Sequence, residues 1–184
     1  AKNQYLGEVY FLRAFYYLHM VNIWGPIPYN SEPPTEIVTT PTRMPEEEVY
    51  GKILEDIDLS IAAFTAANYV IKTDGHASLW AARALKARTL LYAASWLGKN
   101  GITSNTAYSG KDLYALAKTE AEAVIGSGIA SFYTNFADTW SMSNEDIRTN
   151  KESIWGVAYS HDLTTTSNCI PYRYKTDASG TKMQ

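Results

Sequence analysis

The 184-residue sequence predicts a mainly all-α fold, an α-solenoid of antiparallel helix pairs with long connectors and an irregular C-terminal tail. Three observations support this prediction. Four segments carry apolar residues at the three- and four-residue spacing that is typical of helices. Glycine or proline stands at the ends of these segments, where helices stop or start. Only one short segment has the character of a strand, so the helices must pack on one another.

The first expected helix runs from about Asn3 to Trp24 and is apolar or aromatic on nearly every side. A helix of this kind is buried on more than one face, so we expect neighbouring helices to cover it on both sides. It ends before Gly25-Pro26, because proline cannot continue a helix. A stiff, extended connector follows, since six of the seven prolines lie between Pro26 and Pro45.

The second expected helix starts at Pro45, because proline is favoured at the first helical position. Glu46, Glu47 and Glu48 would fill its first turn, where the positive end of the helix dipole favours carboxylates. Its apolar residues form one stripe, which predicts an amphipathic helix with one buried face. The position of the three glutamates therefore explains them without a metal site or an acid cluster.

The third expected helix spans about Ala77 to Leu97, and its seven alanines would let neighbouring helices approach closely. Gly98 would close it. Ser109, followed three residues later by Asp112, predicts a capping box for the fourth helix, which covers residues 111–128. The inward side of that helix would be formed by Leu113, Leu116, Ala117, Ala121, Val124 and Ile125.

We expect one helical domain over residues 1–184, as part of a longer chain. Residues 1–66 would hold the first helix pair with the proline-rich connector, and residues 76–128 the second pair. Residues 129–184 would form loops and a short strand in ESIWGVAYS (152–160). Successive antiparallel pairs are typical of tetratricopeptide-like solenoids, although the connectors are too long and unequal for a strict 34-residue period.

Composition excludes several classes of protein. The formal charge is −3 and the sequence has no basic tract, so we expect no nucleic acid partner. Cys169 is the only cysteine, so the sequence offers no internal disulfide and no paired-cysteine zinc motif. No apolar run reaches the roughly 18 residues that a membrane span needs.

The sequence also lacks catalytic motifs. The three histidines are far apart, and no metalloprotease, nucleophile-elbow, phosphate-loop or dinucleotide motif is present. Asp56 and Asp58 stand two residues apart on a helix, so their side chains would point in different directions rather than across one cleft. We therefore expect no enzyme activity, no catalytic residues, no cofactor and no metal site.

Aromatic residues carry the main hint of a binding function. The chain has fourteen tyrosines and five tryptophans, and several of them stand in connectors. Such rings suit carbohydrates, because a ring stacks on the C–H face of a sugar while nearby amides and charges bind its hydroxyls. The candidate ligand-binding residues are Trp24, Tyr29, Asn30, Trp140, Tyr172 and Arg173. The alternative interpretation is that each ring packs its connector onto the helices.

Four blocks of the sequence, in the same order, resemble the SusD/RagB family. The first is GEVYFLRAFYYLHMVNIWGPIPY (7–29), which is similar to the family signature. The others are RMPEEEVYGKILEDIDLSI (43–61), AARALKARTLLYAAS (81–95) and NKESIWGVAY (150–159). The second block departs from the family pattern at its end, where alanine is usual, and the C-terminal tail has no match.

The resemblance implies a cell-surface lipoprotein of the Bacteroidetes outer membrane with a tetratricopeptide-like helical core. Such proteins bind oligosaccharides or other nutrients, mainly through connecting loops, and deliver them to a SusC-type TonB-dependent transporter. The lipid-anchoring cysteine of the family is not in this segment, so membrane association is expected only through an anchor outside it. Two alternatives stay open: a tetratricopeptide-type protein-interaction scaffold without its own glycan site, and a glycan-active enzyme with its carboxylates elsewhere.

Overall fold

The computed structural model describes residues 1–32, 35–37, 39–72, 75–141, 144, 146 and 148–156. These residues form four α-helices and one short 3-10 helix. The α-helices are α1 (Lys2–Trp24), α2 (Glu46–Ala66), α3 (Leu79–Leu97) and α4 (Leu113–Gly126), and the 3-10 helix is η1 (Phe136–Trp140). The predicted all-α fold is confirmed.

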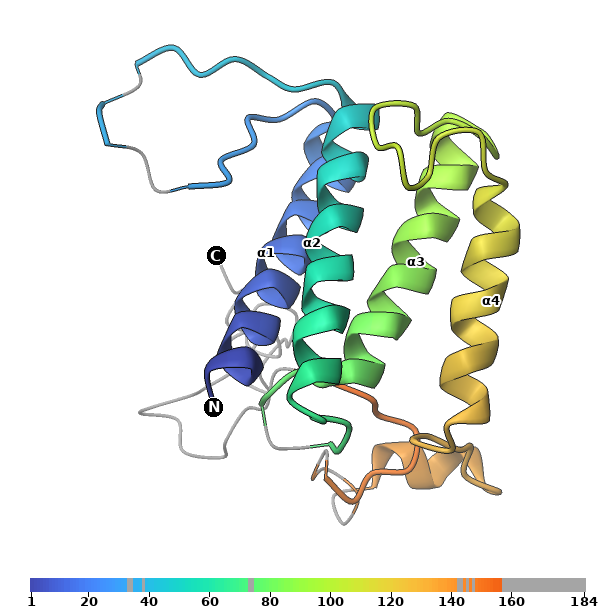
Figure 1. Cartoon of the computed structure of the whole chain (residues 1–184). Coiled ribbons are helices and arrows are strands. Elements are labelled where there is room, and N and C mark those ends of the chain that lie inside the picture. Colours follow the sequence, from blue (N-terminus) through green and yellow to red (C-terminus); the bar gives the residue numbers. More distant parts are fainter. Residues whose placement is uncertain are drawn as a thin grey trace, which may run out of the picture.

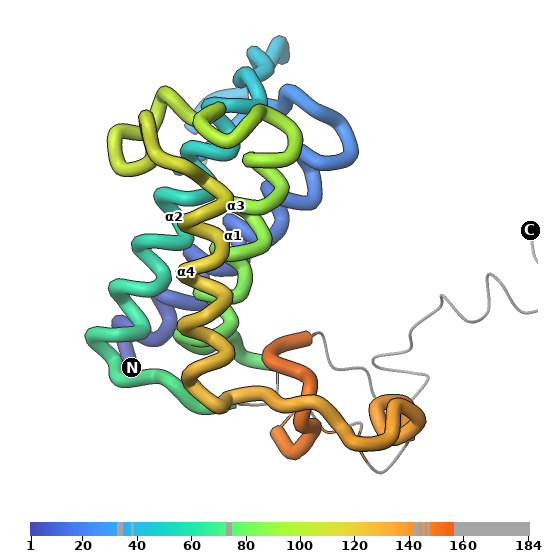
Figure 2. The backbone as a smooth tube through the Cα atoms, turned by 90° about the vertical axis from the view of Figure 1, so that its right-hand side faces the viewer, coloured from blue at the N-terminus to red at the C-terminus, as the bar shows by residue number. Residues whose placement is uncertain are grey.

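The helices form two antiparallel pairs, α1 with α2 and α3 with α4, and the pairs join where α2 packs on α3 (Figure 1). Because the direction alternates along the chain, α1 and α3 run the same way and end at the same end of the bundle. The connector 25–45 lies at that end, whereas η1 lies at the opposite end (Figures 1 and 2).

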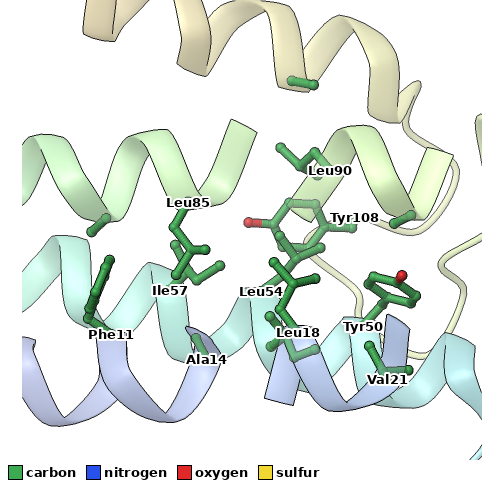
Figure 3. Packing of buried hydrophobic residues seen from close by; sticks show 14 of the residues in the cluster. Phe11, Ala14, Leu18, Val21, Tyr50, Leu54, Ile57, Leu85, Leu90 and Tyr108 are labelled. Atoms are coloured by element: carbon green, nitrogen blue, oxygen red, sulfur yellow. The ribbon is translucent and has the colours of Figure 1, made fainter. Parts of the chain in front are cut away.

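The core lies between the helices along the whole row (Figure 3). Phe11, Ala14 and Leu18 of α1 face Leu54 and Ile57 of α2, and all five side chains are buried. Leu85 of α3 lies beside Ile57 on the other side of α2, whereas Leu90 lies on the side of α3 that faces α4, as Figure 3 shows. Full burial of a leucine, isoleucine or phenylalanine side chain contributes about 1.5–3 kcal/mol, so this seam holds the row together.

A glycine allows the close contact between α1 and α2. Gly7 is buried, and a Cβ atom added to it would lie 2.7 Å from the ring of Phe64. The hydroxyl of Ser60 donates a hydrogen bond of 2.7 Å to the Gly7 carbonyl across the same contact. Any larger residue at position 7 would force the buried Phe64 ring to shift.

The structure corrects the expectation that α1 is covered on both sides. Within the described residues α1 packs mainly on α2, and its opposite face is open. We call that face the α1 outer stripe; it consists of Tyr5, Val9, Leu12, Tyr16 and Ile23, each between 39 and 67 % exposed. Because α1 is apolar on nearly every side, its sequence pattern could not show which face is inward. The small residues Gly7 and Ala14 mark that face, since they let α2 approach closely.

Several helix ends differ from the expected ones by one or two residues, and α4 is two residues shorter than expected at each end. Helix α2 begins at Glu46, with Pro45 just before it, and α3 begins at Leu79, two residues later than predicted. The predicted capping box at Ser109 is wrong, because Asp112 itself caps α4 and accepts hydrogen bonds from the Tyr114 and Ala115 amides. Ile125 is 76 % exposed rather than inward, because it lies off the side of α4 on which Leu113, Ala117 and Val124 are buried.

Little β-structure occurs in the described part of the chain. Residues 152–156 of the expected strand form bends, and residues 157–160 lie outside the described residues. One isolated antiparallel bridge joins Ile27 to Met44, where the Met44 amide donates to the Ile27 carbonyl at 2.9 Å. Among the described helices, none has both the length and the apolar character needed to cross a bilayer.

Candidate functional site

The connector 25–45 is a loop that is closed at its base. Gly25 has a φ of 67°, a backbone angle that residues with a side chain rarely adopt. At this residue the chain turns away from the end of α1. The Ile27–Met44 bridge then brings the two ends of the connector together. The described residues between them project from the bundle as a loop (Figure 1).

A buried ion pair holds the start of this loop against the helices. Asp56 of α2 is 2 % exposed, and the Arg13 guanidinium of α1 donates to both its carboxylate oxygens, at 2.7 and 2.5 Å. Tyr29 also donates to the Asp56 carboxylate, at 2.8 Å, and Arg13 donates to the Ser31 carbonyl at 2.5 Å. Together they fix the chain segment 29–31 on the α1–α2 pair.

This network also fixes the protonation of its members. The hydrogen bond with Asp56 raises the pKa of Arg13 further above its usual value. Burial, followed by the hydrogen bond to Asp56, raises the pKa of Tyr29. Both groups therefore stay protonated at physiological pH, and the Tyr29 hydroxyl stays bound to Asp56. Tyr29 can therefore offer a ligand only its ring. This ring also packs on the ring of Tyr17, with 4.4 Å between the two ring centroids.

Two of the predicted site residues line a cavity of about 740 Å³ in the connector, which we call the loop cavity. Tyr29 and Asn30 form one wall. The backbone N–H of Asn30 donates to the Tyr17 hydroxyl at 2.9 Å, and Asn30 itself is exposed. The other lining residues are Pro28, Thr35, Glu36, Ile37, Pro41 and Thr42.

A second cavity, of about 420 Å³, lies at the same end of the bundle, where α1 and α3 end and α2 begins. We call it the Trp96 pocket. Its lining residues are Val21, Asn22, Ile23, Gly25, Glu46, Tyr50, Tyr92, Ser95 and Trp96. Trp96 is 72 % exposed and Tyr92 47 %, so both rings present a free face. The Trp96 indole N–H donates to the Glu46 carboxylate, which holds the ring against the start of α2.

The neighbouring Glu47 anchors the connector between α3 and α4. Its carboxylate accepts hydrogen bonds from the backbone amides of Thr103 and Ser104. Burial alone would raise the pKa of Glu47, but these hydrogen bonds outweigh burial and lower it. The glutamates at the start of α2 therefore do more than fill the first turn, because Glu46 binds α3 and Glu47 binds the next connector.

The other predicted site residues within the described part of the chain, Trp24 and Trp140, line neither cavity. Trp24 is 63 % exposed and lies in the sequence between Ile23 and Gly25, two residues of the Trp96 pocket. Trp140 lies in η1 at the opposite end of the bundle, where it is 76 % exposed and contacts Phe136 edge-on. Tyr172 and Arg173 lie outside the described residues.

Sequence reasoning missed Tyr92, Trp96 and Glu46 as parts of one site. A signal was nevertheless present. Helices α1 and α3 both carry tryptophan at their C-terminal ends, Trp24 and Trp96, and glycine follows each of them closely. Since alternate helices of an up-down row end on the same side, the two tryptophans had to lie at one end of the bundle.

This geometry can be compared with known proteins. The profile of a SusD-like family, described as starch-binding and associating with the outer membrane, matches residues 1–91. A SusD-like protein of Formosa agariphila, P25, is 26 % identical over 159 residues, which are 86 % of this chain and 26 % of that protein. The chain spans about a quarter of the length of the curated relatives it matches.

Solved structures show the same relationship. A SusD superfamily protein from Bacteroides vulgatus superposes with a TM-score of 0.67 and 27 % identity, over 87 % of this chain and 30 % of that one. A crystal structure with xylogluco-oligosaccharide superposes with a TM-score of 0.66 and 25 % identity, again over 87 % of this chain and 30 % of the other. The chain therefore resembles the SusD-like family in sequence over its first half and in fold over most of its length.

Proposed function

We propose that this chain is part of a surface nutrient-binding protein that binds an oligosaccharide. The observation that carries the proposal is the Trp96 pocket, where two partly exposed rings stand beside a carboxylate and an amide at one end of the bundle. A sugar can stack its C–H face on such rings while its hydroxyls bind the polar groups. The family description as starch-binding and the xylogluco-oligosaccharide complex of a similar structure support it.

In this proposal the binding surface continues from the Trp96 pocket to Trp24 and into the loop cavity at Tyr29 and Asn30. All of these residues belong to the same end of the bundle. Affinity will be modest, because sugar hydroxyls must give up water to bind. The protein binds its ligand without chemical change, so it is not an enzyme.

The test is calorimetry of the intact protein against a panel of oligosaccharides that includes xyloglucan oligosaccharides. Trp96→Ala should weaken binding by about tenfold or more, the factor given by a loss of about 1.4 kcal/mol. Trp140→Ala is a matched control, since its ring is similarly exposed but lies at the other end of the bundle. Equal losses in both variants, or a loss only in Trp140→Ala, would contradict the assignment of this site. Product analysis of the same mixtures should find no hydrolysis.

The proposal extends to delivery of the sugar. The whole protein would be a lipid-anchored surface protein of the outer membrane and pass its ligand to a SusC-type TonB-dependent transporter. The family description as outer-membrane-associated supports this step. Co-purification of the full-length protein with its transporter from outer membranes would support it, and a freely soluble full-length protein that does not associate with the transporter would contradict it.

The α1 outer stripe favours a second candidate, a protein-interaction scaffold. Tyr5, Val9, Leu12, Tyr16 and Ile23 follow the three- and four-residue spacing with which one helix packs against another. The stripe would fit an amphipathic helix of a partner protein. In the double variant Val9→Lys/Tyr16→Lys, loss of partner association with unchanged sugar binding would assign the stripe to that partner.

A further inference from the structure

The charged side chains that line the Trp96 pocket are all of one sign, negative. Its lining contains one carboxylate, that of Glu46, and no lysine, arginine or histidine. One hydrogen bond positions the carboxylate: its Oε2 atom accepts the indole N–H of Trp96. Its Oε1 atom lies near Gly25, where an added Cβ would come within 2.8 Å of it. The negative charge therefore lies between the Trp96 ring and the corner after α1.

Tyr50 and Asn22, two other residues of the lining, supply hydrogen-bond donors without positive charge. Tyr50 is 3 % exposed, and its hydroxyl donates to the side-chain carbonyl oxygen of Asn22 at 2.5 Å. Burial, followed by the charges of Glu46 and Tyr92, raises the pKa of Tyr50 to about 12, so the hydroxyl keeps its proton. With its oxygen bound to Tyr50, Asn22 still has its side-chain amide hydrogens as donors, and the residue is an exposed part of the pocket lining.

Resting on the proposed function, we propose that the Trp96 pocket selects sugars without an acidic group, neutral or amino-bearing, and rejects glycans of uronic or sialic acids. The Trp96 ring stacks on the C–H face of one sugar unit. Glu46 accepts hydrogen bonds from its hydroxyls or from an ammonium group, and Asn22 donates to a ring or hydroxyl oxygen. A carboxylate on the same unit would face Glu46, and no basic group of the lining would offset the repulsion.

A matched pair of probes tests this charge selection. The first is the neutral oligosaccharide that binds best in the panel, and the second is the same oligosaccharide with its primary alcohols oxidised to uronates. Wild-type protein should bind the oxidised probe at least about tenfold more weakly. The difference should shrink as salt rises from about 20 mM to about 500 mM, because ions screen the repulsion.

Two charge-neutralising variants locate the effect. Glu46→Gln should bring the oxidised probe within about threefold of the neutral one, because the amide can still accept the Trp96 indole N–H. Glu48→Gln removes the same charge from the same helical turn, but Glu48 lines a separate groove beside α2, so the difference should remain. Asn22→Asp adds a second carboxylate to the pocket and should widen the difference, which keeps the test open if Glu46→Gln does not fold.

The outcomes separate this inference from the proposed function. Equal binding of the two probes by wild-type protein would overturn the charge selection while leaving sugar binding in place. An equal effect of Glu46→Gln and Glu48→Gln would also overturn it, since the overall charge of the chain would then be responsible. Binding of neither probe, and of no oligosaccharide in the panel, would instead overturn the proposed function.

Discussion

Arg13 of α1 binds both carboxylate oxygens of Asp56 of α2, across 43 residues of sequence, and Asp56 is almost completely buried. The pair does more than join two helices. Through Tyr29 and the Ser31 carbonyl it also fixes the first residues of the connector. The geometry of the loop cavity therefore depends on a residue that no ligand could touch.

The first prediction concerns this ion pair. Asp56→Asn keeps the size of the side chain but leaves the Arg13 charge without its partner, and we expect a loss of about 3 kcal/mol in unfolding free energy. Glu55→Gln is the control, because Glu55 forms an exposed pair with Lys52 and should change stability by about 0.5 kcal/mol or less. Urea denaturation measures both. Similar losses of unfolding free energy in the two variants would show that the buried Arg13–Asp56 pair contributes no more to stability than an exposed pair.

The second prediction concerns the α1–α2 contact. Gly7→Ala places a methyl group 2.7 Å from the Phe64 ring, and we expect a net destabilisation of about 1–2 kcal/mol despite the better helix propensity of alanine. Gly126→Ala, at the end of α4 with no atom within 4 Å of the added Cβ, should be neutral or slightly stabilising. Thermal unfolding compares the two variants. A neutral Gly7→Ala would mean that the Phe64 ring moves aside at no cost.

The third prediction concerns pH. The pKa of Glu47 lies below its ordinary value of 4.5 in the folded protein, so its contribution to stability is present above that value and is lost as pH falls through the lowered pKa. The stability difference between wild type and Glu47→Gln should thus be constant near neutral pH and shrink in acid. Denaturation series at several pH values measure it. Glu48→Gln, which lacks the contacts to Thr103 and Ser104, serves as control, and a difference that grows in acid would contradict the assigned direction.

The fourth prediction compares the two faces of α1. Val9→Lys should change the unfolding free energy of this chain by about 0.5 kcal/mol or less, because Val9 is 60 % exposed. Phe11→Ala, two residues away on the buried face, should cost about 3–5 kcal/mol. Urea denaturation distinguishes them. A large loss in Val9→Lys would mean that another part of the chain covers the α1 outer stripe.

The sequence allowed the helices to be located well but not their contacts. Gly25-Pro26, Pro45 and Gly98 limit the helices by local backbone chemistry, so the ends of α1, α2 and α3 came within two residues of the structure. The inward face of α1 depends instead on the fit between Gly7 and Phe64, which are distant in sequence. Periodicity carries no information on such a fit when every side of a helix is apolar.

For the candidate site, too, the sequence predicted local neighbours but not contacts between distant segments. Trp24, Tyr29 and Asn30 could be placed near one another, because they follow each other at the end of α1. That Trp140 lies at the other end follows only once the number and direction of the helices are known. The separation of Asp56 and Asp58 onto different sides of α2 was predicted and is confirmed, since Asp56 binds Arg13 and Asp58 binds Lys86.

The Ile27–Met44 bridge has a consequence for how such proteins diversify. Because the bridge and the Arg13–Asp56 pair close the loop at its base, the residues between can change in length and composition without altering the helices. Doubling the length of a closed loop adds only about 0.6 kcal/mol to its closure cost. Insertions, deletions and substitutions in this loop are therefore tolerated while the four packed helices keep their structure.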